Sequence, residues 1–193
     1  MAVAHVQGMA EYLDVLDENG NMTGERKLRA HVHRDGDWHR TVHIWIFNAD
    51  RTQVLVQQRS KAKESWPGLW DVSCAGHVSA GESSLEGALK ELEEELGVCP
   101  DTDDAGHEQL VFRFAWKNQA VLNDGAYINN EHTDVYTLCL DRPLSSFVLQ
   151  AEEVEAVRYI PVDRLRFAFS QDPTYVHCDC EEYLAFFDSL MFE

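Results

Sequence analysis

The chain has 193 residues, of which 45% are hydrophobic and 26% are charged. This length and composition predict one compact domain over residues 1–193, with a sizeable core and an N-terminal extension of about residues 1–40. The 16 basic residues are outnumbered by 34 acidic ones, and the net charge of -18 argues against nucleic acid polymers and anionic membranes as partners. An anionic small molecule would need cations placed close to it.

The cysteine content and the N-terminal residues bear on the cellular compartment in which the protein is expected. The five cysteines are an odd number that does not indicate a disulfide framework: Cys74, Cys99, Cys139, Cys178 and Cys180. The HCDC stretch at residues 177–180 lacks the partner pair of a structural zinc site, so we expect free thiols there. With no charged leader before an apolar run and no stretch of membrane-spanning length, we expect a cytoplasmic protein.

The first part of the chain predicts strands. EYLDVLDENGNMTGE (residues 11–25) alternates in polarity and breaks at Asn19-Gly20, which indicates a strand and a turn. RTVHIWIFNADRTQVLVQQR (residues 40–59) predicts a hairpin around Asn48-Ala49-Asp50. SWPGLWDVSCAGHV (residues 65–78) then predicts a Pro-Gly turn, a short strand and a glycine loop.

The most strongly patterned helix follows. Ser83 and Glu86 form a capping-box pattern, and Gly97 is typical of a helix end. A stripe at helical spacing predicts the buried side of this helix, and it consists of Leu85, Leu89, Leu92 and Leu96.

The remaining segments predict further strands and one more helix. Residues 107–118, 132–140 and 154–162 have strand patterns, and residues 180–192 have the pattern of an amphipathic helix. Two sizeable loops are expected, at residues 98–107 and 119–130. The predicted class is α/β, a mixed sheet with helices packed on its faces.

The helix also concentrates negative charge. Residues three and four apart share a helix face, so Glu91, Glu94 and Glu95 converge on one side while Glu93 points elsewhere. Like charges at this spacing repel. Magnesium prefers carboxylate oxygens together with substrate phosphates, so a cation would offset the repulsion. A solvated acidic face is the alternative.

The full spacing resembles the Nudix box, G-x5-E-x7-R-E-U-x-E-E-x-G-U, where U is aliphatic. The matching residues are Gly76, Glu82, Lys90-Glu91-Leu92, Glu94-Glu95 and Gly97-Val98, with Lys90 in place of the usual arginine. The resemblance extends from about Glu11 to the strand near Ile160 and is similar to the branch that includes isopentenyl diphosphate isomerases. It implies a single Nudix-type α/β/α sandwich with a mixed β-sheet.

The resemblance also implies an activity, the hydrolysis of a diphosphate linkage with Mg²⁺, or Mn²⁺, as cofactor. It implies that Glu94, Glu95 and the Gly76 carbonyl hold the metal, that Glu91 is a further ligand or orients the attacking water, and that Glu131 is an extra ligand or base. Glu82 and Lys90 would pair to brace the loop. For Glu131 the alternative is an ordinary loop acid.

Arg59, Lys61 or Lys63 would supply the positive charge near the phosphates. The alternative is that these residues are ordinary surface charges that keep the protein soluble. The substrate would be a nucleoside diphosphate derivative or a related organic diphosphate. His33, His39 and His77 match histidines that hold a metal in the isomerases, although Asn129 replaces one acid of that site. Structural histidines that brace the loop are the alternative.

Two other function classes stay open, an isomerase acting on isopentenyl diphosphate and a non-catalytic diphosphate-binding module. Isomerases carry a catalytic cysteine directly before the Gly-His that matches Gly76-His77, and Ala75 occupies that position here. Cys74 would point to the opposite face of an extended strand. The complete set of box carboxylates favours the hydrolase, and a homodimer is an open alternative to a monomer.

Overall fold

The structure is a computed structural model, and it describes residues 10–63, 65–100, 109–176 and 181–189. Within these ranges the strands form one mixed sheet. The strands are β1 (Tyr12–Leu16), β2 (Met22–Leu28), β3 (Trp38–Phe47), β4 (Gln53–Arg59), β5 (Trp70–Asp71), β6 (Cys74–His77), β7 (Val111–Leu122), β8 (Tyr127–Cys139) and β9 (Val154–Pro161). The helices are α1 (Arg29–Asp35), α2 (Ser84–Leu96), α3 (Leu165–Gln171) and α4 (Glu181–Ser189).

Strand β3 is the centre of the sheet. It pairs in parallel with β8 from Trp38 to Phe47, and it pairs antiparallel with the short β6. Its pairing with β4 is confined to Phe47 and Val54. Strand β4 instead pairs with β9 and β5, so the sheet divides where β3 and β4 separate.

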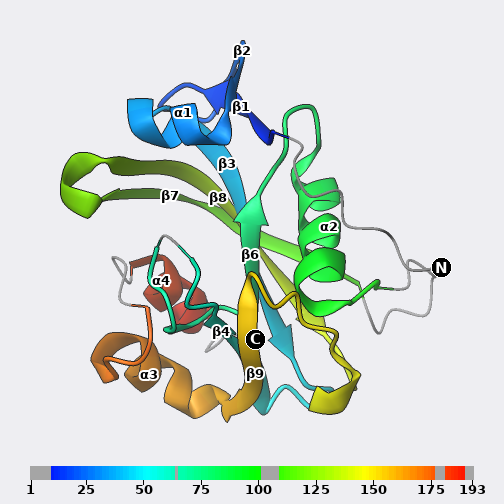
Figure 1. Cartoon of the computed structure of the whole chain (residues 1–193). Coiled ribbons are helices and arrows are strands. Elements are labelled where there is room, and N and C mark those ends of the chain that lie inside the picture. Colours follow the sequence, from blue (N-terminus) through cyan, green and yellow to red (C-terminus); the bar gives the residue numbers. More distant parts are fainter. Residues whose placement is uncertain (1–9, 64, 101–108, 177–180, 190–193) are drawn as a thin grey trace.

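The helices cover the two faces of this sheet (Figure 1). Leu92 and Leu96 of α2 share one core with Val42 and Ile44 of β3. Trp45 lies in the core on the other face with residues of α3 and α4, and its ring stacks on Phe186. This arrangement confirms the predicted mixed sheet with flanking helices.

Strand alternation decides which side chains of β3 face each layer. Because successive residues point to opposite faces, Thr41 and His43 share the face of Trp45. Cys74 is fully buried in the core under α2, as its position next to Ala75 on a strand predicts.

The predicted limits of α2 are confirmed. Ser83 and Glu86 exchange both hydrogen bonds of a capping box, and Gly97 ends the helix in the left-handed conformation. The predicted stripe is wrong at Leu85, which is 47% exposed. Gly87 and Ala88 are buried instead, and a Cβ at Gly87 would lie 3.1 Å from Val78, so small residues let the first turns approach the sheet.

Three segments differ from the sequence expectation. Residues 119–130 were expected to form a loop, but β7 and β8 continue through most of them and turn at Asn123–Gly125. The polar composition of these residues does not indicate strands, but pairing between β7 and β8 stabilises the extended conformation. Helices α1 and α3 were not expected, because a seven-residue helix is too short for a clear periodic signal.

The expected N-terminal extension is described from residue 10 onward. It contains β1, β2 and α1, and β1 joins the sheet through the pairing of Leu16 with Trp38. The predicted C-terminal helix is confirmed over α4. The HCDC stretch at residues 177–180 and most of the loop predicted at residues 98–107 lie outside the described residues. None of the helices within the described ranges has the length and apolar character needed to cross a membrane.

The end of α2 gives a test of packing. Gly97 has a φ of 65°, and a Cβ there would lie 2.7 Å from Val148 Cβ. We expect Gly97→Ala to lower the free energy of unfolding by about 2–3 kcal/mol, of which roughly 1–2 kcal/mol is the cost of the left-handed backbone. Gly24→Ala is the matched control, since its φ is 87° and nothing lies within 4 Å. Equal losses in urea unfolding would show that the contact with Val148 is unimportant.

Candidate functional site

A cavity of about 810 Å³ lies beside the point where β3 and β4 separate. Its lining residues come from β1, α1, β3, β4, β5, β6, α2, β7, β8, α4 and the connecting loops. Three groups of side chains lie at this cavity: the carboxylates of α2, a cluster of histidines of which His77 lines the cavity, and a set of ion pairs.

The carboxylates of α2 converge as the sequence predicts. Glu91, Glu94 and Glu95 all line the cavity. Glu95 is only 4% exposed, whereas Glu94 is exposed. Glu93 is exposed and is not part of the cavity wall. The acidic run is therefore more than a solvated face.

Gly76 makes room for this group. A Cβ at Gly76 would lie 2.1 Å from the carboxyl carbon of Glu91, so any side chain at this position would displace Glu91. On the neighbouring residue, the Ala75 amide lies 3.4 Å from Glu95 Oε2. The glycine of the box thus lets the helix press its carboxylates against β6.

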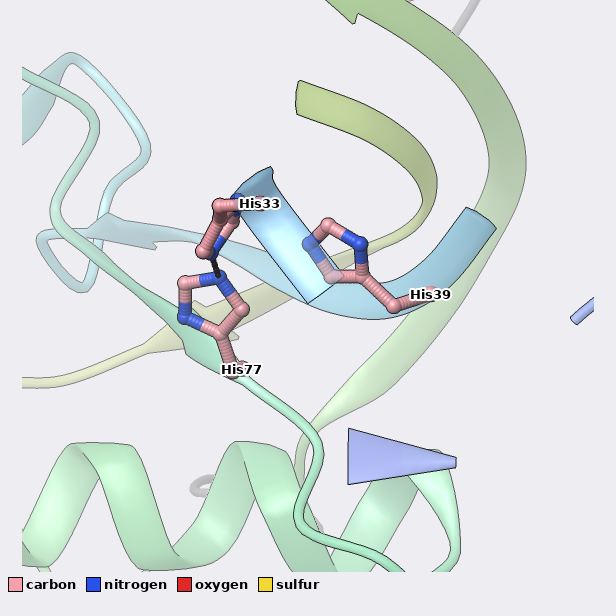
Figure 2. Close-up of side chains that lie close together, drawn as sticks. All are labelled: His33, His39 and His77. Atoms are coloured by element: carbon pink, nitrogen blue, oxygen red, sulfur yellow. Dashed lines mark hydrogen bonds between the residues drawn. The ribbon is translucent and has the colours of Figure 1, made fainter. Parts of the chain in front are cut away.

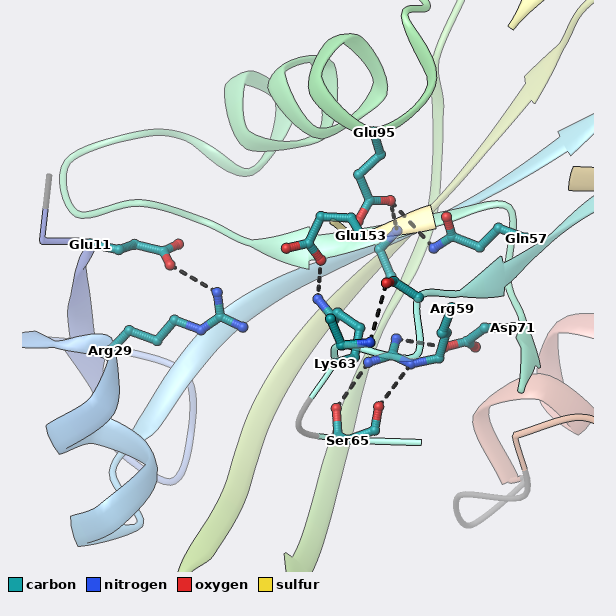
Figure 3. Close-up of polar contacts among 12 residues, drawn as sticks. Glu11, Arg29, Gln57, Arg59, Lys63, Ser65, Asp71, Glu95 and Glu153 are labelled. Carbon is teal, nitrogen blue, oxygen red and sulfur yellow. Dashed lines mark hydrogen bonds and ion pairs between the residues drawn. The ribbon is translucent and has the colours of Figure 1, made fainter. Parts of the chain in front are cut away.

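Positive charge compensates these carboxylates only in part. Burial and then the charge of Glu95 raise the pKa of Glu91 well above its usual range, and Lys90 opposes this rise without cancelling it. Burial also raises the pKa of Glu95 to about 7, although Lys63 opposes the shift. Gln57 Nε2 approaches Glu95 Oε2 at 3.3 Å (Figure 3). A divalent cation that prefers oxygen ligands fits this cluster of one buried, one partly buried and one exposed carboxylate.

The predicted cations occupy different places. Arg59 lines the cavity, where it donates to Asp71 at 3.0 Å and to Ser65 (Figure 3). Lys63 also lines the cavity and pairs with Glu153. Lys61 is not part of the cavity wall. Its side chain is 77% exposed and pairs with Glu155 on the surface, so the prediction that it joins the site is not supported.

The predicted brace between Glu82 and Lys90 is not formed. Lys90 Nζ donates to Ser79 Oγ at 2.9 Å. Glu82 Oε2 is buried and has no hydrogen-bond partner among the described residues. Both side chains line the cavity. A single hydrogen bond to Ser79 suits the ammonium group of lysine, because lysine lacks the planar, bidentate guanidinium group of arginine.

The three predicted histidines converge from three elements (Figure 2). One ring nitrogen from each of His33 (α1), His39 (β3) and His77 (β6) lies within 4.8 Å of the others. His33 Nε2 and His77 Nε2 are 3.1 Å apart. Burial, followed by the neighbouring His39, lowers the pKa of His33 to about 4. Burial also lowers the pKa of His77 well below its usual range.

Two buried polar atoms beside this cluster lack partners within the described part of the chain, namely His39 Nε2 and Asn129 Oδ1. Glu131 Oε1 lies 3.7 Å from His39 Nε2, which is too far for a hydrogen bond. Burial opposes the charge of Glu131, but His39 and the other histidines lower its pKa overall. Imidazoles, a carboxylate and unpartnered acceptors suit a transition-metal ion.

The structure adds a group that the sequence reasoning missed. His43 Nδ1 lies 2.7 Å from Glu182 Oε1, and Asn118 Nδ2 donates to Glu182 Oε2 at 2.7 Å. Burial opposes the charge on His43, but Glu182 outweighs it and raises the pKa of His43 to about 9. The one signal in the sequence is a histidine inside an apolar strand, at the same alternation as Thr41.

Comparison with known proteins identifies relatives. The family model described as the NUDIX domain matches residues 37–178. The chain is 50% identical over 182 residues to Nudix hydrolase 3 of Arabidopsis thaliana, covering 92% of this chain and 23% of that protein. It therefore spans less than a quarter of this relative. It is 39% identical over 133 residues to the isopentenyl-diphosphate Delta-isomerase of Serratia proteamaculans (strain 568), covering 69% of this chain and 68% of that protein.

A solved structure supports the same fold. The crystal structure of DR0079 from Deinococcus radiodurans superposes with a TM-score of 0.69 at 18% sequence identity. The match covers 93% of this chain and 98% of that chain. At 18% identity this similarity shows a shared fold and nothing further.

The pairing of His43 with Glu182 gives a pH-dependent stability. The pKa of His43 is raised to about 9 in the folded chain. The stabilisation is thus fully present below about pH 6.5, the ordinary pKa, and is lost as pH rises through about 9. The carboxylates that face His43 are Glu182 from α4, Asp71 from β5 and Glu131 from β8.

We expect Glu182→Gln to lower the free energy of unfolding by on the order of 3 kcal/mol near pH 6, because it leaves a buried imidazolium without its counter-ion. The loss should shrink near pH 10, where His43 is neutral in both proteins. Urea unfolding at the two pH values measures both effects. Glu181→Gln changes an exposed acid on the same helix and should have little effect. A loss that is independent of pH would contradict the assignment.

Proposed function

The chain belongs to the NUDIX domain family, and we propose that it hydrolyses the diphosphate linkage of a nucleoside diphosphate derivative or a related organic diphosphate with Mg²⁺ as cofactor. The observation that carries this proposal is the set of three carboxylates, Glu91, Glu94 and Glu95, gathered at one cavity against Gly76. Glu95 is buried, Glu91 is partly buried, and the pKa values of both are raised, so the site is suited to receive a cation. A non-catalytic binding module would not need the complete set.

Glu94, Glu95 and the Gly76 carbonyl would hold the magnesium ion. When bound, Mg²⁺ supplies charge neutralisation on the diphosphate oxygens and lowers the pKa of a water molecule. Glu91 lies in the same wall and orients the attacking water or joins the ligands. Mn²⁺, which takes similar oxygen ligands, is the alternative ion.

Two basic residues serve the phosphates. Arg59 and Lys63 line the cavity, and each is paired with a carboxylate, Asp71 and Glu153 respectively. Phosphate oxygens can share the remaining donors of Arg59, whose planar fork suits them. Lys63 lowers the pKa of Glu95 through its charge, so this cation acts on the same carboxylate group.

His33, His39 and His77 form a second metal site in this proposal, with Glu131 and Asn129 beside it. The support is their convergence within 4.8 Å and the two unpartnered polar atoms. Imidazole ligands favour zinc or another transition metal over magnesium. The two sites would thus hold ions of different character at one cavity.

The alternative reaction is isomerisation of isopentenyl diphosphate. Ala75 lines the cavity at the position where the isomerases carry cysteine. Cys74 is fully buried in the core on the other face, and burial, then Glu95, raises the pKa of its thiol well above the usual range. A buried thiol of this kind is a poor acid-base group. The residues therefore favour phosphate chemistry.

Substitution of the buried carboxylate tests the hydrolase. We expect Glu95→Gln to reduce turnover by on the order of 100-fold or more, since it removes a metal ligand. Its metal-free stability should be equal or higher, because a buried like charge is removed. Phosphomonoester release, measured with Mg²⁺ over a panel of nucleoside, isoprenoid and thiamine diphosphates, is the assay.

The control for this substitution is Glu93→Gln, on the exposed side of the same helix. It should retain wild-type turnover. Wild-type turnover of Glu95→Gln at saturating Mg²⁺ would refute the role of Glu95. Absence of hydrolysis across the whole panel by the unmodified chain would refute the proposed function.

Cobalt(II) tests the histidine site separately. Added to the metal-free chain, it should produce a visible absorption band from imidazole coordination, which His77→Ala abolishes and Glu95→Gln retains. His31→Ala is the control, because His31 is exposed on α1. A band that persists in His77→Ala would show that the three histidines do not bind the ion.

A further inference from the structure

His43 lies on the floor of the cavity, next to the carboxylate site. It is on β3, where its register partners are Ala75 of β6 and Val135 of β8. The Ala75 amide approaches Glu95 Oε2 at 3.4 Å. His43 and Ala75 both line the cavity. One strand, with a small side chain facing the cavity, thus separates His43 from the proposed magnesium ligands.

The ring of His43 is held on one side only. Its Nδ1 forms a hydrogen bond with Glu182 Oε1 at 2.7 Å. The second oxygen of Glu182 accepts from Asn118, which also donates to Thr133 Oγ1 at 3.1 Å. Residues of β7, β8 and α4 therefore hold the Glu182 carboxylate in place, and this carboxylate orients the ring of His43. Among the described residues, no group accepts a hydrogen bond from His43 Nε2.

The charge of His43 agrees with this geometry. Because its pKa is raised to about 9, both ring nitrogens carry hydrogen at neutral pH, and Nε2 is a charged donor. Glu182 is only 2% exposed. Replacing a buried ion pair by an apolar pair of similar volume is often neutral or stabilising, so stability alone is weak grounds for a cation at this position.

Three other cations of the cavity wall each pair with a carboxylate, and Lys90, also in the wall, donates to Ser79. Arg29 pairs with Glu11, Arg59 with Asp71 and Lys63 with Glu153 (Figure 3). His43 differs because its counter-ion lies behind the ring, on the side of α4. Its remaining donor therefore has capacity for an anion that enters the cavity.

We propose that His43 binds the substrate, with its Nε2–H donating to a non-bridging oxygen of a diphosphate that lies over Ala75. Glu182 is a positioning residue that holds the ring for this contact. The inference rests on the proposed function, and it deepens that function by assigning a phosphate contact on β3, next to the carboxylates of α2.

Methylene diphosphonate, a diphosphate mimic that resists hydrolysis, is the probe. With Mg²⁺ present, we expect calorimetry to give about tenfold weaker binding for His43→Gln, the loss typical of one charge-assisted hydrogen bond. Glu182→Gln should also weaken binding, and Glu182→Asp should restore part of it, because the carboxylate is retained. His31→Gln replaces an exposed histidine and should bind as the unmodified chain does.

The unmodified chain gives a second measurement that needs no substitution. In nitrogen-15 histidine spectra, the Nε2 resonance of His43 should shift when the Mg²⁺–diphosphonate is added. Unaltered binding by a folded His43→Gln variant, or an unmoved Nε2 resonance at saturation, would overturn the contact and leave the proposed hydrolysis intact. A chain that neither binds the probe nor cleaves any diphosphate of the panel would overturn both.

Discussion

Two carboxylates, the buried Glu95 and the partly buried Glu91, constrain the rest of the site. Burial raises the pKa of each, so the fold must provide polar neighbours or a cation for them. Gly76 lets Glu91 lie against β6, while Gln57 and the Ala75 amide approach Glu95. The separation of β3 and β4 places these groups at the edge of a cavity, where an ion can reach them. A continuous sheet would have sealed them in a core.

Groups of different charge occupy different parts of the site. The acidic groups of α2 line the cavity, the histidine cluster reaches it through His77, and His43, whose pKa is raised to about 9, also lines it. Each cluster has a different preference: hard oxygen donors for magnesium, imidazole nitrogens for a transition metal, and an imidazolium for an anion. A diphosphate coordinated by a metal carries the charges that such an arrangement complements.

The local elements of the fold were largely predictable, because their signals are short-range. The capping box of Ser83 and Glu86 and the left-handed end at Gly97 depend on neighbours within one turn, and both are observed. The errors arose where tertiary packing overrides local pattern. Leu85 belongs to the apolar repeat but is exposed. Residues 119–130 have the composition of a loop, yet most of them form the paired ends of β7 and β8.

The sequence by itself determined the acidic helix, because one α-helix at fixed spacing brings Glu91, Glu94 and Glu95 to a common face whatever surrounds it. Only the tertiary structure decided the other contacts. His33 meets His77 across 44 residues, and His43 meets Glu182 across 139 residues. Lys90 bonds to Ser79 where a pair with Glu82 was expected. Such contacts depend on how strands and helices pack, and no local spacing encodes that geometry.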